Sequence, residues 1–379
     1  MNKQVRSLAC VLVLAGACST LDPDRLTGLR DGYAWNLPAG LPQPVVPVDN
    51  PMSQVKVELG RALFYDARLS GNQTYSCATC HRPELAFTDG RARALGSTGE
   101  LHPRSTMSLV NVAYNLSYNW ADPNLETLEE QALIPMFNQA PVELGLVGME
   151  QEVVERLKQV ADYRAMFAEA FPERPPITSE NVRKALASFV RTIISGDSAY
   201  DHYLFWDQTE ALTTAQHRGM ELFFSPRTRC SECHKAPLFT SGLRRSGQVV
   251  GTNGAGQRFH NTGLYNLDGD GAFPEGGQGL VEHTGLASDM GRFRTPTLRN
   301  IELTAPYMHD GSLETLIEVV DFYAAGGRGE GKNNPFKSGL VEGFVLTEEE
   351  KNDLIEFLCA LSDQSLLENP QLGPGSEPD

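Results

Sequence analysis

The pentapeptide Cys77-Ala78-Thr79-Cys80-His81 has a second copy in this chain, Cys230-Ser231-Glu232-Cys233-His234. Two cysteines at this spacing can form thioether bonds to the two vinyl groups of one haem, and the next histidine then lies beneath the iron as its axial ligand. A structural zinc site would have its Cys-x-x-Cys units roughly 15–20 residues apart, whereas residues 82–229 separate these two. A thioredoxin-like redox pair needs no following histidine. The sequence therefore predicts two covalently bound haem c groups, with His81 and His234 as iron ligands.

The residues around the two pentapeptides are also alike. Glu-Leu-Gly-Arg-Ala-Leu-Phe at 58–64 precedes the first copy, and Arg-Gly-Met-Glu-Leu-Phe at 218–223 precedes the second. Leu-Ala-Phe-Thr-Asp-Gly at 85–90 follows the first copy, and Leu-Phe-Thr-Ser-Gly at 238–242 follows the second. This self-similarity predicts an internal duplication, with one haem unit in each half.

The regular segments have helical patterns. Thr178 or Ser179 is expected to cap a helix in which apolar residues recur at helical spacing. Thr213 and Thr347 each stand three residues before a Gln or Glu, which is the spacing of a capping box. Ser312 is expected to cap a further helix. Strand-type alternation is nearly absent, and the Gly- and Pro-rich stretch 242–291 predicts a long loop. These patterns together predict an all-α fold with long loops.

The length of the chain suggests two domains. We expect an N-terminal cytochrome c-like domain at residues 22–196 and a C-terminal one at residues 197–365. Residues 366–379 are predicted to form a disordered tail.

The N-terminus is typical of an export signal at residues 1–18. Basic residues precede an apolar run at 8–14 that is too short to span a bilayer. Small residues at 15–17 then lead into Cys18, a pattern that resembles a bacterial lipoprotein cleavage site; ordinary signal-peptidase cleavage is the alternative. Both predict a periplasmic protein, and the first adds a lipid anchor to the outer membrane through Cys18.

The charge limits the partners that we expect. A formal net charge of −16 argues against nucleic acid and against an anionic membrane surface, so the lipid anchor would be the only membrane contact. Cys359, which neither haem nor lipid uses, is interpreted as an inert core residue.

Two further blocks carry a family resemblance. Phe-Arg-Thr-Pro-Thr-Leu-Arg-Asn at 293–300 and Ala-Pro-Tyr-Met-His-Asp-Gly at 305–311 resemble the signature of the bacterial dihaem cytochrome c peroxidases and their MauG relatives. The resemblance runs from about Pro51 to Leu361. Tyr-Ala-Trp-Asn-Leu-Pro at 33–38 and Phe-Thr-Asp-Gly-Arg-Ala at 87–92 look most like the MbnH-like branch.

The resemblance implies different roles for the two haems. At the C-terminal haem, Tyr323 occupies the position where the peroxidases place a methionine ligand and MauG-type enzymes a tyrosine. A phenolate stabilises oxidised iron, whereas a thioether favours ferrous iron. Met290 and Met308 are the rival ligands, and the alternative for Tyr323 is an ordinary core tyrosine.

At the N-terminal haem the resemblance implies an open, peroxidatic position. Gln131, Pro135 and Glu143 match the family's distal residues, and Glu143 would take a proton from hydrogen peroxide and return it to the departing oxygen. The alternative is that Glu143 is a solvated loop acid, in which case Glu129 or Glu150 would be the nearest substitute.

Further site residues follow from the same resemblance. The blocking loop histidine of the peroxidases corresponds to Ser97, and the nearest histidine is His102, so we expect a permanently accessible haem. Trp120 matches the indole that relays electrons between the haems, with a structural core Trp as the alternative. His309 is interpreted as a hydrogen-bonding residue near a haem edge.

The resemblance also implies a calcium site. Main-chain carbonyls of Thr304 and Pro306 match the family's ligands, while Ser105 replaces the usual asparagine side chain. We therefore expect a calcium ion as an addition to the two haems only where these main-chain carbonyls converge.

Three functions remain open from the sequence. The leading one is a MauG/MbnH-type oxidase that uses hydrogen peroxide at a five-coordinate haem, forms a high-valent dihaem state and oxidises an aromatic residue of a partner protein. The second is a cytochrome c peroxidase that removes peroxide with electrons from a small cytochrome. The third is a non-enzymatic dihaem electron carrier.

Overall fold

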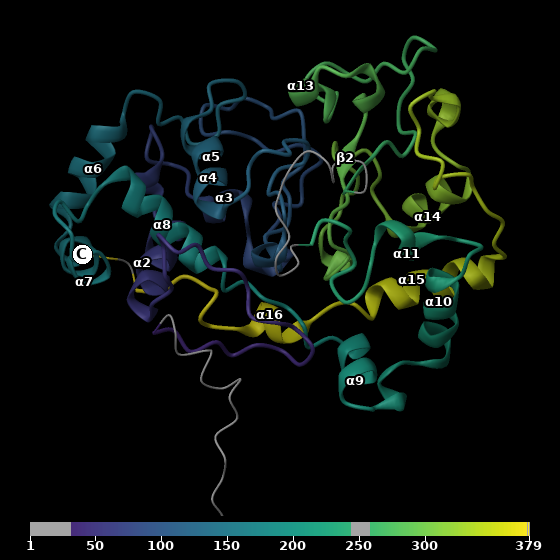
Figure 1. Ribbon diagram of the computed structural model, residues 1–379, viewed down its shortest axis with the longest axis horizontal. Coiled ribbons are helices and arrows are strands. Elements are labelled where there is room, and N and C mark those ends of the chain that lie inside the picture. Colours follow the sequence, from purple (N-terminus) through teal and green to yellow (C-terminus); the bar gives the residue numbers. More distant parts are fainter. Residues whose placement is uncertain (1–31, 244–257, 377, 379) are drawn as a thin grey trace, which may run out of the picture.

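The computed structural model describes residues 32–243, 258–376 and 378 (Figure 1). The predicted export signal, including Cys18, lies outside these residues, as does part of the predicted 242–291 loop. Within the described part, no helix has both the length and the apolar character that crossing a membrane requires.

The described chain is mostly helical, as predicted. Its only strands are β1 (Phe259–His260) and β2 (Phe293–Arg294), which pair antiparallel. The α-helices are α2 (Gln54–Tyr65), α3 (Cys77–Cys80), α4 (Leu128–Gln131), α5 (Leu133–Phe137), α6 (Glu150–Gln159), α7 (Ala161–Ala170), α8 (Ser179–Val190), α9 (Ala199–Phe205), α10 (Thr214–Phe224), α11 (Cys230–Cys233), α13 (Val281–Thr284), α14 (Leu316–Ala324), α15 (Glu348–Cys359) and α16 (Gln364–Glu368).

The connections between these elements contain short 3-10 helices: η1 (Ala67–Leu69), η2 (Pro83–Leu85), η3 (Val112–Tyr114), η4 (Thr209–Ala211), η6 (Ala287–Asp289), η7 (Ile301–Leu303) and η8 (Gly329–Asn333). Long connections without a helix or strand, such as residues 86–111, account for much of the remaining chain.

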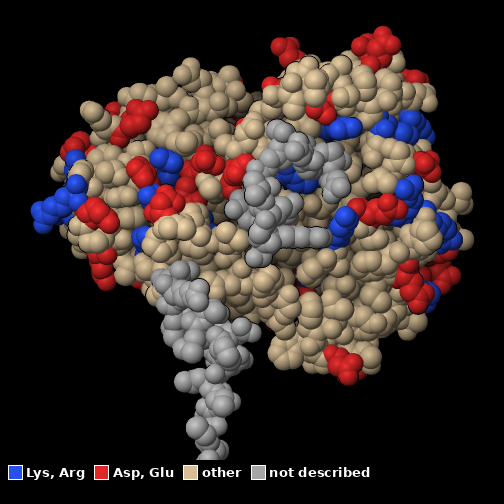
Figure 2. Space-filling model, viewed as in Figure 1, with Lys and Arg blue, Asp and Glu red and all other residues tan. Residues whose placement is uncertain are grey.

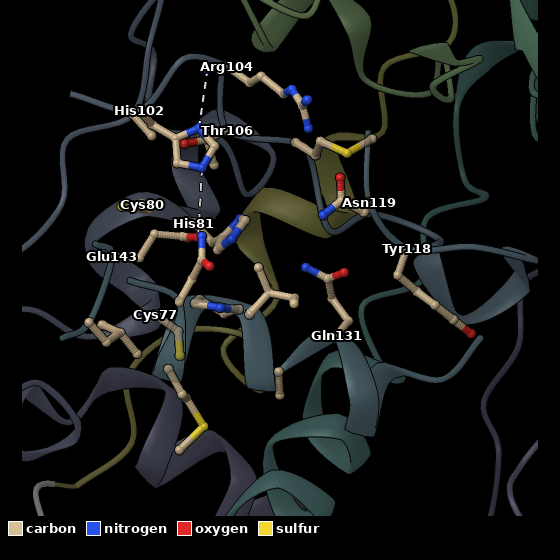
Figure 3. Close-up of a pocket in the computed structure, with 18 of the residues that line it drawn as sticks. Cys77, Cys80, His81, His102, Arg104, Thr106, Tyr118, Asn119, Gln131 and Glu143 are labelled. Carbon is tan, nitrogen blue, oxygen red and sulfur yellow. Dashed lines mark hydrogen bonds and ion pairs between the residues drawn. The ribbon is translucent and has the colours of Figure 1, made fainter. Parts of the chain in front are cut away.

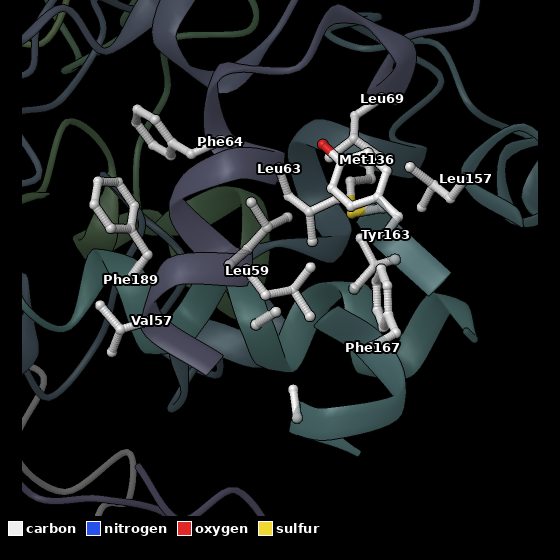
Figure 4. Close-up of a cluster of buried hydrophobic side chains, with 14 of the residues drawn as sticks. Val57, Leu59, Leu63, Phe64, Leu69, Met136, Leu157, Tyr163, Phe167 and Phe189 are labelled. Atoms are coloured by element: carbon white, nitrogen blue, oxygen red, sulfur yellow. The ribbon is translucent and has the colours of Figure 1, made fainter. Parts of the chain in front are cut away.

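The first half is organised by α2 and α8, which pack closely against each other. A Cβ on Gly60 would lie 1.9 Å from the carbonyl oxygen of Ala185 and 2.9 Å from Cβ of Phe189, so only glycine permits this approach. Phe64, one turn further along α2, is buried in the core that forms around this crossing (Figure 4). Burial of that apolar surface is the main stabilising contribution of the helix pair.

The second half repeats this arrangement with α10 and α15. A Cβ on Gly219 would lie 1.9 Å from the carbonyl oxygen of Asp353 and 2.9 Å from Cβ of Phe357. Phe223 stands four residues after Gly219, as Phe64 stands four after Gly60, and is equally buried. The two helix pairs lie on opposite sides of the molecule (Figure 1).

Helix starts follow the sequence signals with one exception. Thr178, Thr213 and Thr347 cap α8, α10 and α15 as predicted. The assignment of Ser312 as a cap is wrong, because α14 begins after Thr315, whose side chain forms a capping box with Glu318.

The predicted tail disorder is also wrong for residues 366–372. After α15 the chain runs back to the first half (Figure 1), where Leu366 and Leu372 are buried in its core. The hydroxyl of Tyr65 donates a hydrogen bond to the Leu372 carbonyl. Burial of two leucines on a short segment is enough to order it. The prediction of disorder failed because it rested on the mainly polar composition of the tail.

Candidate functional site

The first pentapeptide forms a single helical turn followed by a buried histidine. Ser76 and Thr79 form a capping box at the start of α3, and His81 ends the turn. Nδ1 of His81 lies 2.9 Å from the carbonyl oxygen of Phe87. A carbonyl can only accept, so Nδ1 carries the proton and the Nε2 lone pair is free for a metal. Burial lowers the pKa of His81 and keeps the ring neutral, the form that binds iron.

The second pentapeptide is built in the same way. Nδ1 of His234, which follows α11, lies 3.1 Å from the carbonyl oxygen of Phe239. Burial lowers the pKa of His234 to about 4, with nearby His260 adding to the effect. Phe87 and Phe239 both have left-handed backbones, with φ of 62° and 51°. Such strain costs roughly 1–3 kcal/mol per residue, and here it turns each carbonyl toward its histidine.

These groups fit covalently bound haem. Cys77, Cys80, Cys230 and Cys233 are free, partly buried thiols, and each pair stands at the two ends of one turn. Each following histidine is neutral and offers Nε2. Thiols for attachment and an oriented imidazole for the iron are the donor set that c-type haem requires.

A cavity of about 480 Å³ lies beside the first pentapeptide. Its wall includes His81, Gln131 at the end of α4, and Glu143 in the loop after α5 (Figure 3). Trp120 and Pro135 of α5, which the sequence analysis also singled out, line the same cavity. The fold therefore brings the predicted distal residues to the same cavity as the predicted proximal ligand.

Two polar groups in this cavity are suited to a polar ligand. Oε1 of Gln131 is buried and has no hydrogen-bond partner among the described residues. Burial raises the pKa of Glu143 to about 7, although roughly a third of its side chain stays accessible, with a side-chain exposure of 32%. A carboxyl group with a pKa near neutrality can both accept and return a proton, which is what acid–base catalysis at neutral pH requires.

The two substitute glutamates do not line the cavity. Oε1 and Oε2 of Glu129 lie 2.9 and 3.1 Å from Nη2 of Arg191, in a buried ion pair. Glu150 is exposed in the first turn of α6. Of these carboxylates, Glu143 is the one placed for chemistry in the cavity.

Trp120 lies between the cavity beside His81 and the apolar cluster against which Tyr323 packs. It lines the cavity of His81 and also packs against the apolar cluster of the second half, against which Tyr323 packs too. Its Nε1 donates to the Ser105 carbonyl at 2.9 Å, which fixes the indole plane. This position suits a relay between two haems, and that role stays a prediction.

Tyr323 belongs to α14 and is close to the second pentapeptide. Burial raises the pKa of Tyr323, and the neighbouring Cys233 and Cys230 thiols add to that effect. A phenol in this setting keeps its proton unless a cation lies next to it, and ferric iron would be such a cation. Met290 and Met308 pack on the same cluster, so the axial ligand stays a prediction.

The predicted calcium segment has only part of the expected arrangement. The amide of Ser105 donates to the His309 carbonyl at 2.8 Å, so residue 105 contacts the loop that holds Thr304 and Pro306. The Ser105 hydroxyl, however, donates to the Met308 carbonyl at 3.1 Å. His309 is buried and stacks on Phe293, with ring centroids 3.7 Å apart. A cation held by main-chain carbonyls at this loop stays a prediction.

Sequence reasoning missed part of the cavity wall. Arg104, Tyr118 and Asn119 also line the cavity (Figure 3), although no motif pointed to them. His102, considered above only as a blocking ligand, has its Nε2 3.8 Å from Oε1 of Glu143. The only available signal was proximity in sequence to Ser105 and Trp120.

Comparison with known proteins gives a consistent relationship. A family model described as di-haem cytochrome c peroxidase matches residues 54–209. The chain is 35% identical over 336 residues to the methylamine utilization protein MauG of Methylorubrum extorquens, covering 88% of this chain and 85% of that protein. It is 36% identical over 365 residues to cytochrome-c peroxidase IdrP1 of Pseudomonas sp. (strain SCT), covering 89% of each.

A solved structure is also closely similar. It is described as a MauG-like protein associated with microbial copper homeostasis, and it superposes with a TM-score of 0.84 at 45% sequence identity. The match covers 90% of this chain and 99% of that one.

Proposed function

The chain belongs to the dihaem cytochrome c peroxidase family, which includes MauG, and from this premise we propose that it is a MauG-type oxidase. It would react with hydrogen peroxide at the His81 haem and withdraw electrons from a partner protein. As a family member it is a peroxidase-type oxidoreductase with two haem c groups.

One observation carries the proposal. A single cavity holds His81, the partnerless Gln131 amide oxygen and the Glu143 carboxyl, whose pKa burial raises to about 7. Any haem needs such a cavity, but an electron carrier would place a second iron ligand there, whereas these residues are a proton-transferring carboxyl group and a hydrogen-bonding amide.

The haems, when bound, supply the electron exchange; the chain's residues handle protons and orientation. Reduction of one peroxide molecule to two waters consumes two protons and two electrons. Glu143 would accept the proton of the oxygen that approaches His81's haem and deliver it to the oxygen that leaves. Gln131 would orient the peroxide by accepting a hydrogen bond from it.

The two electrons would come from the partner protein by way of the second half. Trp120 touches both the cavity and the cluster that contains Tyr323, so it would serve as the relay. Tyr323 as a phenolate ligand would favour the oxidised state of the second iron.

We also infer that residues 22–196 and 197–365 are haem domains that arose by duplication. The matching glycine crossings at Gly60 and Gly219, and the matching Phe87 and Phe239 turns behind the two histidines, support this inference.

The setting that we propose is the periplasm, with a lipid at Cys18 as the means of anchoring. The similarity to a MauG-like protein associated with copper homeostasis favours a partner protein in that process, with an aromatic residue as the site of oxidation. Calcium at Thr304 and Pro306 is the remaining proposed cofactor.

Stoichiometric hydrogen peroxide added to the purified diferric holoprotein, without reductant, tests the proposal. A long-lived spectrum two electrons more oxidised than the resting state is expected. Rapid decay, with turnover only after partial reduction and a cytochrome donor, would instead support a cytochrome c peroxidase. If the protein does not react with peroxide at all, the result would support a non-enzymatic dihaem electron carrier.

A further inference from the structure

A small hairpin is held firmly against the segment that carries Glu143. Residues 94–104 fold back on themselves: the Ala94 amide donates to the Arg104 carbonyl at 3.2 Å, and the His102 amide to the Ala94 carbonyl at 2.8 Å. An isolated β-bridge joins Leu95 and Leu101 within it.

Three contacts join this hairpin to residues 142 and 143. The Ser97 amide donates to the Glu143 carbonyl at 2.8 Å. The Glu100 carboxylate accepts from the Val142 amide at 3.0 Å. A Cβ on Gly96 would lie 1.8 Å from the Val142 carbonyl oxygen, so only glycine allows the two backbones to come this close.

The hairpin also fixes the ring of His102. The backbone amide of Arg104 donates to Nδ1 of His102 at 3.2 Å. Nδ1 is therefore the acceptor and the neutral ring carries its proton on Nε2. Nε2 of His102 lies 3.8 Å from Oε1 of Glu143 (Figure 3), which is longer than a direct hydrogen bond. The Glu143 carboxyl group is partly exposed, at 32%, so it has room to rotate toward this donor.

We propose that His102 is a positioning residue for Glu143: a small rotation of the carboxyl group brings it within hydrogen-bond distance of the neutral Nε2–H, which then orients it and stabilises its ionised form. A donor at this place favours the carboxylate, which is the form that can accept a proton from peroxide. This inference deepens the proposed function and rests on it for its catalytic meaning.

The other charged groups near His102 and Glu143 already have partners of their own, so His102 is the donor available to the Glu143 carboxyl group. Burial and the neighbouring Arg104 lower the pKa of His102 to about 4, so the ring is neutral at neutral pH. Arg104 pairs with Glu282, at 2.7 Å. Nδ1 of His283 lies 3.7 Å from Oδ2 of Asp122, and the Glu100 carboxylate accepts a hydrogen bond from the Val142 amide. Between pH 5 and 9, titration in the pair therefore belongs to Glu143, whose pKa burial raises to about 7.

The test compares His102→Phe, which removes the donor, with His102→Gln, whose amide N–H restores it. Thr98→Ala, at an exposed position of the same hairpin, is the matched control. In each holoprotein, infrared difference spectra against pH follow the Glu143 carboxyl band, which Glu143→Gln identifies by its loss. Stopped-flow spectra give the rate of reaction with peroxide over the same pH range.

His102→Phe is expected to raise the midpoint of the carboxyl titration by about one pH unit and to slow the peroxide reaction about fivefold at pH 7, with the deficit vanishing at high pH. His102→Gln and Thr98→Ala should retain the wild-type midpoint. An unchanged midpoint in His102→Phe would overturn the inference, and so would a change in resting haem coordination in that variant, since His102 would then be an iron ligand. If the wild-type protein does not react with peroxide but His102→Phe still raises the midpoint of the Glu143 titration, the proposed function is wrong and the interaction of His102 with Glu143 is supported.

Discussion

The two pentapeptide sites are nearly identical on one side of the histidine and different on the other. Behind His81 and His234 the same strained phenylalanine turn presents a carbonyl to Nδ1, at 2.9 and 3.1 Å. In front of His81 lies a cavity with a carboxyl group and an amide, whereas Tyr323 lies near the second pentapeptide. A short local motif is therefore enough to repeat the haem attachment, whereas the reactivity of each site depends on residues that distant segments supply.

The largest effect on the difference between the two sites is expected from Glu143→Gln. Removing the acid–base group should slow the reaction with peroxide by roughly 10²–10⁴-fold. In wild-type protein the rate should rise as pH increases through about 7, where Glu143 loses its proton, and this pH dependence should disappear in the variant. Stopped-flow spectroscopy of the holoprotein measures both. Glu150→Gln, an exposed glutamate close in sequence, should react at the wild-type rate.

Tyr323→Phe tests the second site, where Tyr323 is proposed to be the iron ligand opposite His234. Loss of the phenol oxygen should remove the low-spin signal of the C-terminal haem in electron paramagnetic resonance and leave the His81 signal unchanged. Tyr323→Met should raise the potential of that haem by a sizeable part of the roughly 0.8 V range over which axial ligands act. Tyr307→Phe makes the same chemical change in the same apolar cluster and is expected to be silent. An unaltered low-spin signal in Tyr323→Phe would make one of the methionines the better candidate.

The buried ion pairs of the two halves offer a comparison of stability. Arg299 and Asp201 are almost completely buried, with side-chain exposures of 0% and 1%, whereas those of Arg191 and Glu129 are 3% and 11%. Leaving a buried arginine without its partner costs about 3–5 kcal/mol. Asp201→Asn and Glu129→Gln should each lower the free energy of unfolding in that range, and the former by more. Denaturant titration checks the order. A peroxide rate that fell in folded Glu129→Gln would show that Glu129 is more than structural.

The helix crossings allow the smallest and most symmetrical test. Gly60→Ala and Gly219→Ala each force a methyl group against a carbonyl oxygen, and overpacking of this kind costs about 1–3 kcal/mol. Because the two crossings have the same geometry, the two losses in thermal stability should be similar. Gly339→Ala, where the added methyl group meets nothing within 4 Å, is the control. Unequal losses would weaken the case for duplicated halves.

Local features of this chain were predictable because a few neighbouring residues decide them. Thr178, Thr213 and Thr347 cap helices as expected, since a hydroxyl three residues before a free amide needs no distant partner. The prediction failed at Ser312, where Thr315 with Glu318 forms the better cap three residues later. It failed again at the tail, because burial of Leu366 and Leu372 depends on a surface in the other half of the chain.

The two haem attachment points could be read directly from the residue order, because a Cys-x-x-Cys-His spacing places two thiols and one imidazole on a single helical turn. The sequence also identified Gln131, Pro135 and Glu143 as distal candidates, through resemblance. Folding was needed to show that these residues share one cavity with His81, and that a hairpin holds Nε2 of His102 3.8 Å from Oε1 of Glu143. The reason is physical: bonding patterns on one turn are set by short-range geometry, whereas burial and the shift in the Glu143 pKa arise from segments that meet only in the folded chain.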